Sequence, residues 1–98
     1  MTSITESITI RPAYGDDHEA LVRLAALDSA DQVPSRPILL AEVDGEVRAA
    51  MSLRDRSAIA DPFHPTVHLV ELLQAHADAA ERSHERRVFS RRPRLGYA

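Results

Sequence analysis

The chain has 98 residues, which is enough for one small domain with a single modest core. It has no cysteine, which excludes a disulfide framework and a thiolate zinc site, and no apolar run approaches the roughly 18 residues that a membrane-spanning helix needs. The first residues show no secretory signal pattern either, so we expect a cytoplasmic protein that has no membrane partner.

The charge is distributed unevenly along the chain. All 12 basic residues are arginine, and the net charge is −3. Six arginines and one glutamate give residues 82–98 a charge of +5, which leaves −8 on residues 1–81. The sequence thus predicts an acidic body followed by a basic tail.

The first two elements are a strand and a helix. Residues 8–12, ITIRP, alternate apolar and polar side chains, which predicts a short half-buried strand with Pro12 near an end or an edge. A helix follows, because Asp16 and Glu19 have the spacing of a capping box. Four apolar side chains of this helix fall on one face: Leu21, Leu24, Ala25 and Leu27.

The strongest local pattern lies in residues 38–53, ILLAEVDGEVRAAMSL, where an Asp-Gly pair separates two apolar runs. This pattern predicts a β-hairpin, whose turn is either a two-residue type I′ loop or a three-residue loop with its glycine in the left-handed region. We prefer the three-residue loop of residues 43–45. It places Ala41 opposite Val47, whereas the shorter loop sets Ala41 against Arg48.

A turn at residues 54–57 and a brief strand at residues 58–60 come next. The last helix is predicted to begin near Pro65 or Thr66, because proline suits a first helical turn and threonine a cap. Its apolar stripe consists of Leu69, Leu72, Leu73, His76 and Ala80. Asp78 and Arg82 are spaced to form an ion pair on the solvent side of this helix.

The helical pattern decays after Arg82. We therefore predict a domain over residues 1–82 and a basic, flexible tail over residues 83–98. The element order is strand, helix, strand, strand, strand, helix. This order predicts an α+β fold with a mainly antiparallel sheet of three or four strands and two helices.

That order, with ITIRPA leading into a helix and LLAEVDGEVRAAMSL as the hairpin, resembles the GNAT acyltransferase superfamily over about residues 7–80. In that family an x-I-R-x-A motif opens the first strand, and an x-A-E-x-D-G-x-x-V-G hairpin forms the second and third strands. The chain is similar in particular to short GNAT-like proteins of actinobacterial type, which end after the helix that follows the fourth strand. The resemblance implies a truncated β-α-β-β-β-α half domain.

By the same resemblance, the loop before the last helix corresponds to the cofactor-binding loop of the family. Longer family members bind the pyrophosphate of acetyl-CoA there with a glycine-rich loop. A pyrophosphate needs inward backbone N–H donors at a helix start. In this chain the segment ADPFHPT occupies that place: Pro62 and Pro65 have no N–H, and Asp61 adds negative charge. We therefore predict no catalytic residue and no cofactor-binding residue.

Histidines and carboxylates offer three further candidates. Asp61, His64 and His68 gather around the start of the last helix, but no recognised zinc signature contains them, so we predict no metal site. His76 is predicted at the edge of the core with one ring nitrogen bonded to backbone or water, in preference to a catalytic role. Glu42 is predicted to be a solvated strand residue.

The tail is a candidate anion-contacting segment. Phe89 and Tyr97 are interleaved with its arginines, and neutralised phosphates would make binding salt-dependent. A solubilising tail without a ligand is the competing interpretation. The candidate contact residues are Arg86, Arg87, Arg91, Arg92 and Arg94.

These observations lead to three functional hypotheses. The first is a non-catalytic GNAT-like module that binds protein and forms a homodimer, because a shortened sheet leaves apolar surface or an unpaired edge. The second is an N-acyltransferase that completes its acetyl-CoA site through a dimer or a partner chain. The third is an anion-binding or nucleic-acid-binding module that uses the arginine-rich tail.

Overall fold

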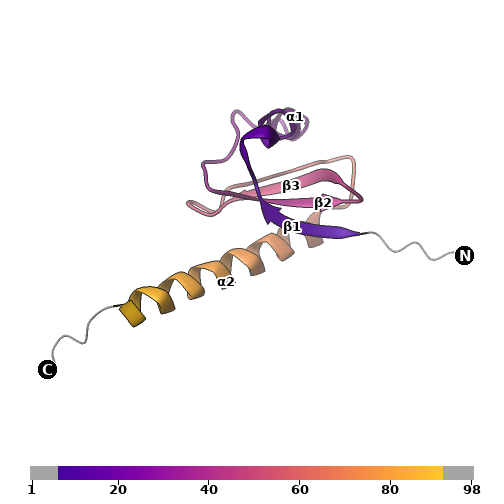
Figure 1. Ribbon diagram of the computed structural model, residues 1–98. Helices are drawn as coiled ribbons and strands as arrows, with labels where there is room; N and C mark the ends of the chain where they lie inside the picture. Colours follow the sequence, from indigo (N-terminus) through magenta and orange to yellow (C-terminus); the bar gives the residue numbers. More distant parts are fainter. Residues whose placement is uncertain (1–6, 92–98) are drawn as a thin grey trace, which may run out of the picture.

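The structure is a computed structural model that describes the backbone of residues 7–91 and the side chains of residues 7–83. Its four strands form one antiparallel sheet in the order β1-β2-β3-β4, and it has two α-helices, which confirms the predicted α+β fold (Figure 1). The elements are β1 (Ile8–Pro12), the short 3-10 turn η1 (Gly15–Asp17), α1 (His18–Leu27), β2 (Ile38–Val43), β3 (Glu46–Ser52), β4 (Ala58–Ala60) and α2 (Val67–Arg91).

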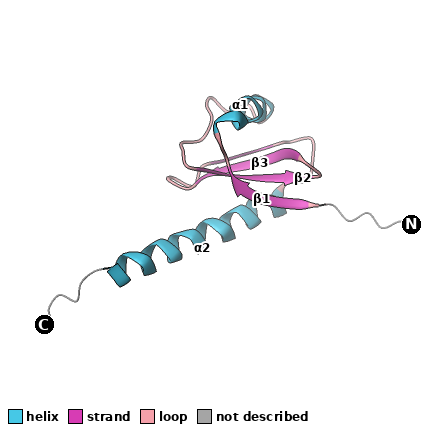
Figure 2. Cartoon of the chain, viewed as in Figure 1, coloured by secondary structure: helices cyan, strands magenta, loops and turns pink. Residues whose placement is uncertain are grey.

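The two helices cover opposite faces of the sheet (Figure 2). This arrangement follows from the alternation of side chains along a strand, which gives each face its own apolar set. The core on the α1 side consists of Leu21, Leu24, Ala25, Ile38, Leu40, Ala50 and Ile59. The core on the α2 side consists of Ala41, Ala49, Met51, Leu69, Leu73 and Ala77.

The start of α1 differs from the prediction. The turn η1 precedes the helix, and Asp17 replaces Asp16 as the carboxylate that organises this segment. Asp17 Oδ2 accepts the backbone N–H of Tyr14 at 2.7 Å, and the Asp17 N–H donates to the Tyr14 carbonyl oxygen at 3.0 Å. The predicted apolar face is buried at three of its four positions, while Leu27 is 38% exposed.

The hairpin between β2 and β3 also differs from the prediction. Asp44 and Gly45 alone form the loop, with φ of 51° and 85°, and a type I′ turn requires two such residues. Ala41 pairs with Ala49 because Arg48 is an extra residue of β3, a β-bulge. The preferred three-residue loop is therefore wrong. The three-residue loop was preferred because it avoids pairing Ala41 with Arg48. The bulge at Arg48 avoids the same pairing and allows the two-residue turn.

The buried side of α2 is a narrower row than the sequence pattern predicted, and it includes Ala77, which the predicted stripe left out. Leu69, Leu73 and Ala77, each four residues apart, are buried. His76 and Ala80 are exposed, although the pattern placed both on the apolar stripe. Rows of residues four apart are inclined to the helix axis, so α2 crosses the sheet obliquely and its later turns extend beyond the sheet (Figure 1).

Arg56, in the turn between β3 and β4, contacts α2 where the helix leaves the sheet. Its Nη2 lies 2.9 Å from Asp78 Oδ1 and 2.7 Å from Glu81 Oε1. Asp78 is thus paired with Arg56 and not with Arg82 as predicted. The helix continues past Arg82 to Arg91, so backbone order extends beyond the position where the periodicity ends. The division into a domain of residues 1–82 and a tail of residues 83–98 stays a prediction.

Across the described chain, neither helix combines the length and the apolar composition that a membrane crossing needs.

Candidate interaction surface

The ladder between β1 and β2 determines which backbone groups of β1 face away from the sheet. The N–H of Ala13 donates to the Ile38 carbonyl oxygen at 2.9 Å, and the N–H of Asp44 donates to the Ser7 carbonyl oxygen at 2.9 Å. In an antiparallel pair, residues bonded to the neighbouring strand alternate with residues whose backbone groups point outward. The odd-numbered residues of β1 therefore bond to β2, and the even-numbered residues face the outer edge.

Two of the three outward residues of β1 have free backbone groups. Ile8 and Ile10 each present an N–H and a C=O, and within the described residues no hydrogen bond reaches these four groups. Pro12 has no N–H, and its carbonyl oxygen accepts a hydrogen bond from Arg11 Nη1 at 3.0 Å. The sequence predicted this proline near an end or an edge, and Pro12 lies at both, as the last residue of an outer strand. The open part of the edge is thus the segment from Ile8 to Ile10.

An apolar groove lies beside this open edge, on the face of the sheet that α2 covers. We call it the β1–α2 groove; its volume is about 280 Å³, and it is lined by Ile8, Val43, Pro65, Val67, His68 and Leu69. Val67 is 75% exposed and Ile8 is 37% exposed, although both side chains are apolar. Apolar side chains that gather at one exposed place are typical of a contact surface.

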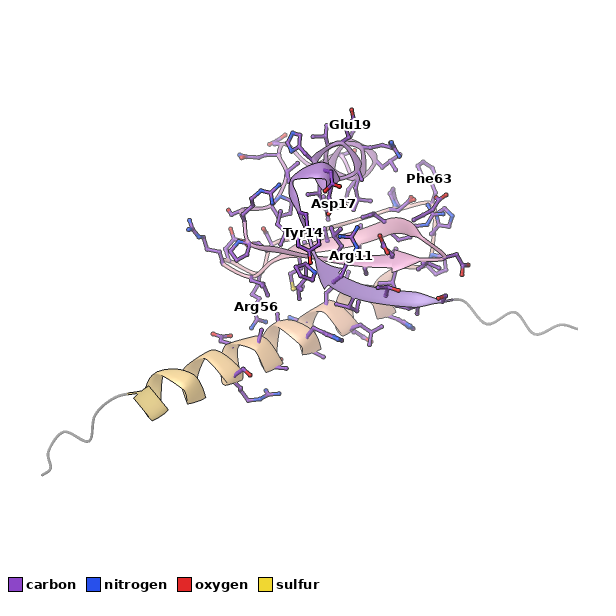
Figure 3. The ribbon with its side chains drawn as sticks, in the orientation of Figure 1. Arg11, Tyr14, Asp17, Glu19, Arg56 and Phe63 are labelled. Atoms are coloured by element: carbon purple, nitrogen blue, oxygen red, sulfur yellow. The ribbon has the colours of Figure 1, made fainter. Side chains whose placement is uncertain are left out.

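Arg11 joins β1 to the start of α1 and to β2 (Figure 3). Its Nη2 lies 2.8 Å from Asp17 Oδ1 and 2.9 Å from Glu42 Oε2, and its guanidinium carbon lies 5.9 Å from the centre of the Tyr14 ring. The predicted solvated position of Glu42 is wrong, because its side chain is only 18% exposed and accepts hydrogen bonds from Arg11. The charge of Arg11 is therefore balanced within the domain.

This cluster changes the acidity of its members. The hydrogen bond from Arg11, followed by the one from the Tyr14 N–H, lowers the pKa of Asp17 from 3.8 to about 2. The same contact with Asp17, followed by the one with Glu42, raises the pKa of Arg11 above its ordinary value. The attachment of β1 to α1 thus depends on an ionised Asp17.

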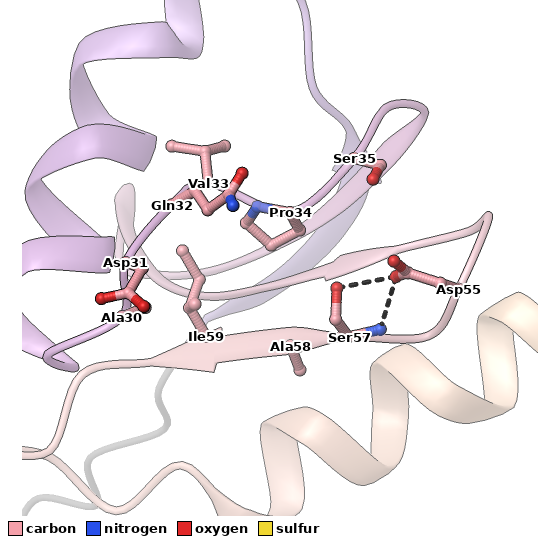
Figure 4. Close-up of a pocket in the computed structure, with 10 residues that line it drawn as sticks. All are labelled: Ala30, Asp31, Gln32, Val33, Pro34, Ser35, Asp55, Ser57, Ala58 and Ile59. Carbon is pink, nitrogen blue, oxygen red and sulfur yellow. Dashed lines mark hydrogen bonds between the residues drawn. The ribbon is translucent and has the colours of Figure 1, made fainter.

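The edge of β4 contrasts with the edge of β1. The N–H of Ala60, which points away from β3, donates to Asp28 Oδ2 at 3.1 Å. The segment of residues 30–35 passes beside this strand and encloses with it a cavity of about 470 Å³ (Figure 4). Asp55, at the rim of this cavity, accepts hydrogen bonds from the N–H and the hydroxyl of Ser57 at 3.0 and 2.7 Å. A short, partly covered strand with a bonded N–H is a poor template for another strand.

The loop between β4 and α2 is organised around Asp61, which is only 3% exposed. Asp61 Oδ1 accepts the N–H of Phe63 at 2.9 Å, and Oδ2 lies 3.1 Å from Arg48 Nη1 and 3.1 Å from His64 Nδ1. The N–H of Phe63, with smaller contributions from His64 and Arg48, lowers the pKa of Asp61. The bulge in β3 gives Arg48 its position beside this carboxylate.

The structure brings only part of the histidine set together. His64 contacts Asp61, whereas His68 lines the β1–α2 groove. In the part of the chain that the structure describes, no group of three histidine or acidic residues could hold a metal ion. His76 is exposed rather than at the core edge, and its Nδ1 lies 3.0 Å from the Leu72 carbonyl oxygen, a backbone contact of the kind predicted.

The side chains of the five candidate anion-contacting arginines lie outside the residues that the structure describes. The backbone of Arg86, Arg87 and Arg91 belongs to the last turns of α2, but their side chains are outside the described residues. Arg92 and Arg94 are outside the described residues altogether. The anion-binding hypothesis stays a prediction.

Comparison with known proteins gives no match to a family model, to a curated protein or to a solved structure. The GNAT resemblance therefore depends on the motifs of this sequence alone.

Proposed function

We propose that this chain is a non-catalytic, GNAT-like protein-interaction module that forms a homodimer through the open edge of β1 and the β1–α2 groove. The observation that carries the proposal is that an open strand edge and an exposed apolar groove meet at one place. Ile8 belongs to both, because its backbone groups form part of the edge and its side chain lines the groove.

The open edge of β1 and the exposed β1–α2 groove each favour association with another chain in water. Free N–H and C=O groups on an edge attract other strands, and proteins usually shield such an edge with charge, proline or a covering segment. At β1, within the described residues, only Pro12 shields the edge in this way. Arg11 does not add a free charge there, because it is paired with Asp17 and Glu42. Covering Val67 and Ile8 with another chain removes apolar area from water, which favours association by about 25 cal/mol per Å² before the costs of binding.

The loop before α2 supports the non-catalytic part of the proposal. The backbone N–H groups of Phe63 and His64 both donate to Asp61, to its carboxylate and its carbonyl oxygen respectively. Pro62 and Pro65 have no N–H to offer. An incoming pyrophosphate would have to compete with the carboxylate of Asp61 for these donors and would be repelled by its charge.

Sedimentation equilibrium tests self-association. We expect the wild-type chain to be a dimer at micromolar concentration and Val67→Asp to be a monomer, because the substitution puts a charge into the groove. The variant should keep its fold, since a carboxylate is favourable in the first turn of a helix. Val22→Asp is the matched control: Val22 is 46% exposed on α1, on the opposite face, and its variant should remain dimeric.

A compact wild-type monomer at high micromolar concentration would overturn the proposal. The acyltransferase alternative is tested in parallel by thermal unfolding with millimolar acetyl-CoA. We expect an unchanged midpoint, and a midpoint that rises with the cofactor concentration would favour that alternative instead.

A further inference from the structure

The geometry of β1 points to the arrangement of the dimer, an inference that rests on the proposed self-association. We propose that two copies pair their β1 strands antiparallel about a two-fold axis at Thr9. In this register Ile8 of each copy lies opposite Ile10 of the other, and the two four-stranded sheets become one sheet of eight strands.

This register uses every free backbone group of the open edge. Two residues that form a hydrogen-bonded pair in an antiparallel ladder exchange both of their N–H···O bonds. Ile8 and Ile10 face outward in each copy, so the Ile8–Ile10 pair occurs twice about the axis and satisfies all eight outward groups. The contact is isologous, because both copies contribute the same residues.

A register shifted towards the other end of the strand is less complete. It would place Ile8 opposite Pro12, which has no N–H to donate and whose carbonyl oxygen already accepts from Arg11. The interface would then lose two donors and compete for two acceptors. Pro12 and Arg11 together therefore favour the pairing centred on Thr9 over the pairing centred on Ile10.

The side chains are compatible with the same register. Thr9 faces Thr9 of the second copy, and threonine pairs across strands are favourable. Arg11 lies opposite Ser7, so no like charges are directly opposed, and its own charge is balanced by Asp17 and Glu42.

The groove indicates why the occupant is a second copy of this chain. A two-fold axis perpendicular to the sheet keeps both α2 helices on the same face. The β1–α2 grooves of the two copies then face each other across the joined strands, so the exposed side chains of Ile8 and Val67 are covered from both sides. An isolated peptide strand would satisfy the edge but would leave Val67 in water.

A single introduced cysteine tests the register, because the chain has none of its own. Thr9 and its symmetry mate form a non-hydrogen-bonded pair with Cα atoms about 4.5 Å apart, within the range of about 4.4–6.8 Å that a disulfide spans. We expect mild oxidation of Thr9→Cys to give a covalent dimer that reductant reverses. Sedimentation of the reduced variant and its thermal unfolding show whether the dimer and the fold are intact.

Ser7→Cys is the matched control. Ser7 is exposed and directly precedes β1, two residues before Thr9, but in this register the two Ser7 Cα atoms are about 14 Å apart, too far for a disulfide. Equal cross-linking of both variants would overturn the inference. So would an uncross-linked Thr9→Cys protein that sediments as a dimer, a result that leaves the proposed self-association intact. A monomeric wild-type chain would overturn both.

Discussion

The two outer strands of the sheet meet their surroundings in different ways. At β4, a strand of three residues, the carboxylate of Asp28 accepts the outward N–H of Ala60, and the segment of residues 30–35 passes alongside. At β1, a strand of five residues, the outward groups of Ile8 and Ile10 have no partner within the described residues, and apolar side chains lie beside them. At β4 one outward N–H is bonded and the short strand is partly covered, whereas at β1 all four outward groups of Ile8 and Ile10 are free within the described residues, so β1 is where we expect a second chain.

The largest effect should come from closing the edge of β1. Ile8→Pro removes an N–H that points away from β2, so it leaves the ladder of the monomer intact, as Pro12 already does. In the proposed dimer it removes two hydrogen bonds of about 1 kcal/mol each, which weakens dimerisation by roughly 30-fold. The dissociation constant from sedimentation equilibrium measures this effect.

Two variants separate the hydrogen bonds from other effects of that substitution. Ile8→Ala loses the same apolar side chain but keeps the N–H, so the 30-fold weakening is expected relative to this variant. Thr9→Pro removes an inward N–H and should destabilise the fold. Equal dimer affinity of Ile8→Pro and Ile8→Ala would show that the edge does not pair.

A smaller effect is expected from acid, which acts on the attachment of β1. The folded pKa of Asp17, about 2, is below its ordinary value of 3.8, so the stabilisation is present above about pH 4 and is lost as the pH falls through the folded pKa. After allowance for solvent screening, we expect a contribution of about 1 kcal/mol to the free energy of unfolding.

Urea unfolding of the wild-type chain and of Asp17→Asn measures this contribution. The wild type should be the more stable at pH 6, and the difference should shrink between pH 4 and pH 2. A difference that stays constant over this range would show that the ionised carboxylate of Asp17 does not hold the strand.

The smallest effect on stability is expected at β4. Asp28→Ala frees the N–H of Ala60, at a cost of about 0.5–1 kcal/mol because the bond is exposed. The variant loses the one bonded outward group of β4, so this edge should pair more readily and form species larger than a dimer in size-exclusion chromatography with light scattering. Asp28→Asn keeps a side-chain acceptor and should behave like the wild type. Dimers alone from Asp28→Ala would show that the covering segment is sufficient to protect β4.

The parts of the fold that depend on neighbouring residues were predicted well. The bounds of β1 and β4 agree with the alternation of residues 8–12 and with the short run of residues 58–60. The hairpin register was missed, because pairing rules for an uninterrupted ladder do not reveal the extra residue Arg48. The apolar stripe of α2 was partly misassigned, since it included the exposed His76 and Ala80 and left out the buried Ala77, because the angle at which a helix crosses a sheet is not encoded in its periodicity.

The contact surface could be predicted only in outline. The short sheet predicted apolar surface or an unpaired edge, and Pro12 was predicted near an end or an edge of its strand, so the sequence did not identify which outer strand is open. Asp28 accepts the outward N–H of Ala60 from 32 positions away along the chain, and nothing local identifies that contact. The β1–α2 groove arises where β1, the end of β2 and the start of α2 meet, so it exists only in the folded chain.

The ion pairs of Arg56 with Asp78 and Glu81 attach α2 to the turn between β3 and β4, at the end of the sheet. Beyond Glu81 the helix advances for ten more residues to Arg91, or about 15 Å at 1.5 Å per residue. In a dimer joined at β1, both helices lie on one face of the joined sheet, and the last turns of each extend beyond the end of that sheet. The two-fold axis would then fix the positions of both helix ends relative to each other, so the dimer would hold two copies of the last turns of α2 at one set separation.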